Sequence, residues 1–212
     1  MTEPSTAATG PFTGNAKQGA TPDPVCKELK DTTDAKRKEL GDRSTNKRVV
    51  GKDATGKGTT VTAMKAITGD GTAQVAAAHN DANALKFCPS GLVEGAGPDV
   101  RSGEKTPLCP QSDYKHPPDA QQKSGHAEAR LIGALGGARS MTITFSIDWR
   151  KGAGRRSNMP CQNCLDMLCA AMKECDFNIS LCDKKGQPHA LNEEQHCSAN
   201  GRQKLLKTMG EY

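Results

Sequence analysis

Residues 126–175 read HAEARLIGALGGARSMTITFSIDWRKGAGRRSNMPCQNCLDMLCAAMKEC and contain the clearest pattern of helices and strands in the chain. Residues 126–138 carry apolar side chains at helical spacing and stop at a Gly-Gly pair, which predicts an amphipathic helix. Residues 140–148 predict a strand. Pro160 stands where a helix can begin, so 160–175 predict a second helix. Helix, strand and helix in succession indicate an α/β fold.

The flanking segments extend a sheet around this strand. Residues 59–67 and 72–79 are β-capable runs, and the Asp70-Gly71 pair between them suits a tight hairpin turn. Residues 177–183 and 186–191 predict two short strands joined by a tight turn, hence antiparallel. We therefore expect a mixed, roughly five-stranded sheet whose last two strands are antiparallel.

The two ends of the chain differ in character. Residues 1–45 form a linker-like N-terminal segment, poor in apolar residues, with a possible helix over 25–41 that ends at a glycine. Residues 46–212 form the predicted domain. Within it, Pro and Gly punctuate 81–123 too often for regular elements, and such a long loop is usually functional or mobile.

Composition limits the function classes. The net charge of +5 is compatible with a polyanionic partner and equally with a solvated surface carrying a modest lysine excess. No apolar run approaches the ~20 residues that span a bilayer, which argues against a membrane protein. The N-terminus shows neither the basic start nor the apolar stretch of a cleavable signal peptide.

Nine cysteines are present, and five of them fall between Cys161 and Cys182. Their clustering favours a reduced, metal-binding interior over a disulfide framework. Cys88 and Cys109 flank the Gly/Pro-rich loop and are the pair expected to form any disulfide. Cys169 and Cys175 have the spacing of inward helix positions and are expected in the core rather than on a metal.

The residues that carry chemistry are His126, Glu128, Cys161 and Cys164. Two thiolates three apart at a helix start can face one metal ion, where the helix dipole favours their ionised form. His126, at the start of the other helix, adds a third ligand. Three protein ligands leave the fourth position of a tetrahedral Zn²⁺ site for water, as in catalytic zinc centres. Glu128 is then placed to move the protons.

Two other interpretations of the motif remain open. A lone C-x-x-C is also typical of redox sites and of half a structural zinc site. A structural site would take a fourth ligand, for which His189, Cys182 and His196 are available. That interpretation predicts a non-catalytic zinc-binding module and leaves Glu128 unexplained.

The H-x-E and P-C-x-x-C pattern resembles the zinc-dependent cytidine deaminase-like superfamily over residues 46 to about 200. The resemblance implies a three-layer α/β/α fold and a hydrolase acting on the C–N bond of a cyclic amidine. Water would attack C4 of cytosine or C6 of adenine, with Glu128 as general acid and base. APOBEC-type enzymes carry Ser-Trp-Ser-Pro-Cys before the zinc helix. This chain has Ser157-Asn158-Met159-Pro160-Cys161, so that part of the resemblance fails.

Several residues are candidates for substrate contact. A basic loop with one tryptophan beside a base pocket could follow a phosphodiester backbone and stack a base; the residues are Trp149, Arg150, Arg155 and Arg156. The competing interpretation places the tryptophan at the core edge and the arginines in solvent. By resemblance, Asn80 or Asn83 would contact the sugar, and Ser124 would line the pocket.

The antiparallel final strands resemble the deaminase branch that contains free-nucleoside cytidine deaminases and many bacterial toxin deaminases. The long loop, the linker-like N-terminus and the run Ser-Gly-His-Ala-Glu at 124–128 resemble, in particular, the toxin deaminase domains of bacterial secreted effectors. That resemblance implies delivery by secretion machinery or a carrier domain and action in the recipient cell's cytoplasm. It also implies cytosine-to-uracil conversion in nucleic acid, DNA favoured over RNA, and inhibition by an immunity protein. The alternatives are a cytoplasmic deaminase of free cytidine or another nucleoside, and an adenine deaminase acting on RNA.

Overall fold

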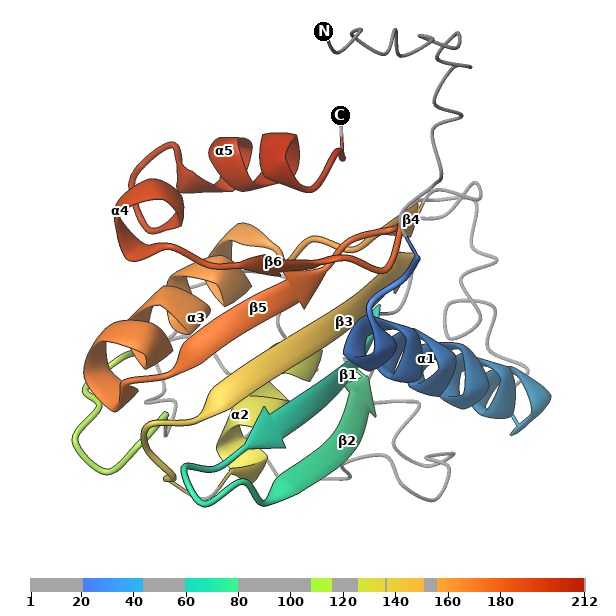
Figure 1. Cartoon of the computed structure of the whole chain (residues 1–212), viewed down its shortest axis with the longest axis horizontal. Helices are drawn as coiled ribbons and strands as arrows, with labels where there is room; N and C mark the ends of the chain where they lie inside the picture. The colour runs from blue at the N-terminus through green and yellow to red at the C-terminus, as the bar shows by residue number, and fades with distance from the viewer. Residues whose placement is uncertain are drawn as a thin grey trace, which may run out of the picture.

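The computed structural model describes residues 21–43, 60–79, 108–115, 126–135, 137–150 and 156–211. Within these ranges a mixed six-stranded sheet is accompanied by five helices (Figure 1). The strands are β1 (Thr60–Ile67), β2 (Ala73–His79), β3 (Thr142–Arg150), β4 (Arg156–Ser157), β5 (Asn178–Cys182) and β6 (Pro188–Ala190). The helices are α1 (Pro24–Arg43), α2 (Ala127–Ala134), α3 (Gln162–Cys175), α4 (Glu193–His196) and α5 (Gly201–Thr208).

The sheet has the order β2-β1-β3-β5-β6. β1 pairs antiparallel with both β2 and β3, β3 pairs parallel with β5, and β5 pairs antiparallel with β6. The prediction of an α/β chain whose last two strands are antiparallel is confirmed. The hairpin at 59–79 is confirmed as well, with its turn at Thr68–Thr72 closed by backbone hydrogen bonds.

The sixth strand is a departure from the expected pattern. Residues 149–159 were expected to form a basic loop, but β3 continues through Arg150 and β4 returns along it, with Trp149 opposite Ser157. Pairing of two residues needs no hydrophobic alternation, so a sequence pattern does not reveal it.

Alternating side chains give the sheet two buried faces. On one face Val61, Ala63 and Ala77 pack against Leu29 of α1. On the other, Met64, Phe145 and Ile147 join the larger core formed with α2 and α3. Figure 1 shows α1 in front of the sheet and α2 behind it. The helices therefore cover both faces.

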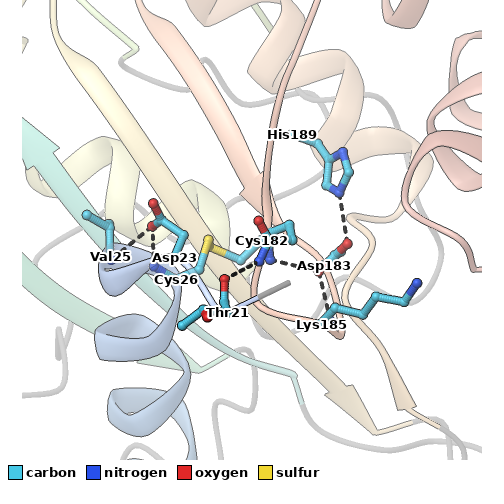
Figure 2. The surroundings of a disulfide bond; sticks show 9 residues. Thr21, Asp23, Val25, Cys26, Cys182, Asp183, Lys185 and His189 are labelled. Atoms are coloured by element: carbon cyan, nitrogen blue, oxygen red, sulfur yellow. Dashed lines mark hydrogen bonds and ion pairs between the residues drawn. A yellow bond between two sulfur atoms is a disulfide. The ribbon is translucent and has the colours of Figure 1, made fainter. Parts of the chain in front are cut away.

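α1 is fixed to the sheet although it falls within the segment predicted to be linker-like. A disulfide joins Cys26 in its first turn to Cys182 at the end of β5 (Figure 2). Farther along, the buried Arg37 donates to the carboxylate and the carbonyl oxygen of Asp148 on β3. The predicted domain boundary near residue 45 lies outside the described residues and stays a prediction.

The expectation of a reduced interior is wrong for six cysteines. They form the disulfides Cys26–Cys182, Cys109–Cys175 and Cys169–Cys197. Cys109 therefore pairs with Cys175 of α3 and not with Cys88, which lies outside the described residues. Cys175 is buried as expected, yet it meets Cys109 there because the segment 108–115 packs into the same core. Spacing in the sequence cannot reveal such a long-range contact.

Among the helices that the structure describes, none combines the length and apolar character needed to cross a bilayer. The predicted irregular segment 81–123 lies outside the described residues except for 108–115.

Candidate metal centre

The starts of α2 and α3 bring the predicted ligands together. His126 is the N-cap residue of α2, with extended backbone, and Cys161 is the N-cap residue of α3. The Cys161 sulfur accepts a hydrogen bond from the backbone N–H of Cys164, 3.3 Å away, and so acts as the helix cap. Both helices thus begin at one point, with the ligand atoms directed at one another.

The ligand atoms lie at the separations that a small cation requires. His126 Nδ1 is 3.1 Å from the Cys164 sulfur and 3.6 Å from the Cys161 sulfur, and the three ligand atoms lie within 4.8 Å of one another. A tetrahedral zinc ion, with its usual bond lengths, holds N and S ligands about 3.6 Å apart. Cys161 and Cys164 are also the free cysteines among the described residues, whereas the six others there are oxidised. The donor set therefore fits Zn²⁺, which is compatible with the predicted cofactor.

The charges of the two thiols differ sharply. Hydrogen bonds from Cys164 and His126 lower the pKa of Cys161 to about 4, although burial opposes the shift. Burial raises the pKa of Cys164 well above its usual value, and the neighbouring Cys161 thiolate raises it further. Cys161 is therefore a thiolate at neutral pH, and a cation at this point would offset the burial of the second sulfur.

Glu128 lies in the first turn of α2, directly behind the ligands. Its side chain is 3% exposed, and its Oε2 accepts from the Cys164 thiol at 3.5 Å. Burial raises the pKa of Glu128, and the charge of Cys161 adds to the shift. A buried carboxyl group beside the ligands has the position that a proton carrier requires.

The candidate substrate residues separate into two groups on the sheet. Trp149 is partly buried and packs against the core on the α2 and α3 face, the side of the metal ligands. Arg156 turns to the α1 face, 3.4 Å from Asp148 and 3.5 Å from Asp34. The structure therefore does not bring Arg156 to the metal centre, because the carboxylates of Asp34 and Asp148 pair with it on the other face of the sheet.

The remaining candidates are not placed. Asn80, Asn83, Ser124 and Arg155 lie outside the described residues. Arg150 ends β3, and only its backbone is described.

The residues nominated as a fourth metal ligand lie elsewhere. Cys182 is in a disulfide, His189 contacts Asp183 at 2.9 Å, and His196 Nδ1 accepts from the Asn192 amide. Over the described ranges the cluster has three members, all of them predicted from the sequence.

Tyr114 is a neighbour of the centre that the sequence did not reveal. Its hydroxyl donates to the carbonyl oxygen of Asn163, the residue before Cys164, at 3.3 Å. Burial raises the pKa of Tyr114, as do the negative charges of Asp166 and the two ligand cysteines. Tyr114 lies in the irregular Gly/Pro-rich stretch, where no pattern distinguishes one residue from the next.

Fold and site together define an α/β chain with a candidate three-ligand metal centre at two helix starts. Comparisons with protein-family models, curated proteins and solved structures found no significant match to the chain.

Proposed function

We propose that the chain is a zinc-dependent deaminase that converts cytosine to uracil in nucleic acid, with DNA favoured over RNA. The observation that carries the proposal is the convergence of His126, Cys161 and Cys164 beside the buried carboxyl group of Glu128. A redox pair would use the two cysteines without the histidine, and a structural zinc site would use a fourth protein ligand. Neither alternative requires Glu128.

The chemistry of the site follows from the residues present. Zn²⁺ held by His126, Cys161 and Cys164 would acidify a water molecule close to neutral pH. Glu128 takes a proton from the attacking water and passes it to N3 of the ring. A second proton moves through the same carboxyl group to the departing amine. Cytosine and water thereby become uracil and ammonia.

The fold supports the same proposal. Helices cover both faces of the mixed sheet, and β3 lies between α2 and α3, which carry the ligands, in the order of the chain. This arrangement is consistent with the three-layer layout expected for cytidine deaminase-like proteins. The antiparallel β5–β6 pair is consistent with the branch that includes both free-nucleoside cytidine deaminases and bacterial toxin deaminases.

The disulfides support a role outside the producing cell. Three disulfides within one small α/β unit are typical of chains that pass through an oxidising environment. We therefore propose an exported toxin, delivered by secretion machinery or a carrier domain, that acts in a recipient cell's cytoplasm. A dedicated immunity protein is the expected partner, and the expected substrate is nucleic acid.

The test is deamination by the purified, zinc-loaded chain and by its Glu128→Gln variant, which keeps the size of the side chain and removes the carboxylate. Cytosine- and adenine-containing single strands, duplexes, RNA and free nucleosides are the substrates. Native mass spectrometry reports bound zinc in both proteins.

Cytosine conversion in a polynucleotide, lost in Glu128→Gln while zinc stays bound, is the expected result. Conversion of free nucleoside alone would instead indicate a metabolic deaminase. Conversion of adenine in RNA would instead indicate an RNA adenine deaminase. No conversion of any substrate by a folded, zinc-bound chain would favour a non-catalytic zinc-binding module.

A further inference from the structure

A short segment outside the regular elements lies against α3 and against the turn that follows α2. We name residues 108–115 the strap; it is the yellow-green segment in Figure 1. Leu108 and Cys109 are buried, and Ser112 is fully enclosed. Pro110 packs on the turn after α2, where a Cβ placed on Gly137 would come within 3.1 Å of its ring. The strap is therefore packed into the core and does not lie loosely over it.

The strap is attached to α3 at both ends of that helix. The Cys109–Cys175 disulfide fixes it at the last residue of α3. The Tyr114 hydroxyl binds the carbonyl oxygen of Asn163 in the first turn. These two points are about 18 Å apart along the helix axis. The strap thus runs the length of α3 toward the metal ligands.

The conformation between the two attachments is fixed as well. The Ser112 amide donates to the Cys109 carbonyl oxygen at 3.0 Å, which closes a turn directly after the disulfide. The Ser112 hydroxyl then accepts from the Tyr114 amide at 3.2 Å. Because the Cys109–Ser112 turn and the Ser112 hydroxyl fix the backbone between Cys109 and Tyr114, we expect the position of Cys109 to determine that of the Tyr114 ring.

We propose that Tyr114 is a substrate-positioning residue, an aromatic surface that stacks an unpaired pyrimidine beside the metal ligands, and that the Cys109–Cys175 disulfide holds it there. The proposal rests on the proposed function. Tyr114 is partly buried, packs against the core of the α2 and α3 face, and donates its hydroxyl to Asn163, the residue before the ligand Cys164. A ring fixed in this way loses little conformational freedom when a base stacks on it.

The test measures binding apart from chemistry. The affinity for a fluorescent cytosine-containing single strand is measured by anisotropy with zinc-loaded Glu128→Gln protein, which need not turn over. Adding Tyr114→Ala should raise Kd about 5- to 150-fold, the range for losing one base–aromatic stack. Tyr114→Phe keeps the ring and should raise Kd less. Zinc content should not change in either protein.

A double-mutant cycle tests the role of the disulfide. Cys109→Ala/Cys175→Ala should raise Kd in the manner of Tyr114→Ala, and the triple variant should bind no more weakly than Tyr114→Ala alone. Cys169→Ala/Cys197→Ala removes another disulfide of α3 and serves as the matched control; its effect should add to that of Tyr114→Ala.

Two results would overturn the proposal: an unchanged Kd for Tyr114→Ala, or simple additivity between Tyr114 and the Cys109–Cys175 pair. These outcomes differ from failure of the proposed function, in which the parent chain with intact Glu128 converts no base whatever Tyr114 does.

Discussion

Removal of the Cys26–Cys182 disulfide should lower the free energy of unfolding strongly while leaving the fold in place. The bond closes a loop of 156 residues and ties the start of α1 to the end of β5. In the chain-entropy treatment, a loop of that size stabilises a protein by about 5 kcal/mol, through restriction of the unfolded chain. Because the Cys109–Cys175 bond already shortens the path, the expected loss is about 4 to 5 kcal/mol.

Contacts other than the disulfide should keep α1 docked in the native state. Leu29 is fully buried, Arg37 is paired with Asp148, and the Lys65 ammonium group contacts Glu28 at 2.8 Å. The double variant Cys26→Ala/Cys182→Ala is the suitable change, because serine would place unpartnered hydroxyls in a buried site.

The assay is urea unfolding followed by fluorescence of Trp149, the single tryptophan of the chain, on the central strand β3. The matched control Cys169→Ala/Cys197→Ala opens a loop of 28 residues, so its expected loss is about 3.5 kcal/mol. A loss below about 1 kcal/mol for Cys26/Cys182, or a larger loss for the control pair, would show that loop size does not set the contribution of this disulfide to stability.

Three further changes probe packing and charge around the sheet. Arg37→Met should cost about 3 kcal/mol in urea unfolding, at the lower end of the range for breaking a buried ion pair, because the Asp148 side chain, 11% exposed, loses its buried cation but keeps the more exposed Arg156 beside it. Although burial acts to raise it, hydrogen bonds from the turn amides and a histidine lower the pKa of Asp183. The ionised Asp183 therefore stabilises the fold above its unfolded pKa, and this stabilisation is lost as pH falls through its folded pKa. The free energy of unfolding should therefore fall more steeply with acid in the native chain than in the Asp183→Asn variant. Gly201→Ala should cost several kcal/mol by thermal unfolding, because its Cβ would lie 1.8 Å from the carbonyl oxygen of His196.

The elements of the fold that the sequence predicted are those set by local pattern. The hairpin β1–β2, the helices α2 and α3 and the strand β3 each depend on periodicity and punctuation within some ten residues. The strand β4 and the three disulfides depend on which distant segments meet. Cys109 meets Cys175 across 66 residues because both enter one core, and nothing in the spacing of the cysteines distinguishes Cys175 from the other possible partners.

The same division holds for the candidate site. His126, Glu128, Cys161 and Cys164 were predictable because each lies at a helix start, where position in the motif fixes the direction of the side chain. Tyr114 was not, since its place depends on a disulfide and a turn that only the folded chain brings together. The sequence of a basic loop likewise does not show which acidic residues its arginines will pair with. Arg156 pairs with Asp34 and Asp148 on the α1 face of the sheet.

The proposed zinc ion would also act during folding, because the two cysteines that would bind it are free while six others form disulfides. A thiolate in a C-x-x-C pair can attack disulfides. Cys161 is such a thiolate at neutral pH, because its pKa is about 4. Zinc bound by both sulfurs would withhold them from exchange while the other six cysteines pair. Oxidative refolding with zinc should therefore yield the three native disulfides and two free thiols at Cys161 and Cys164, as mapped by peptide mass spectrometry after alkylation. Refolding with a chelator should give species in which these two cysteines are cross-linked. Identical maps under both conditions would show that the helix starts alone keep the two sulfurs apart, without help from a metal.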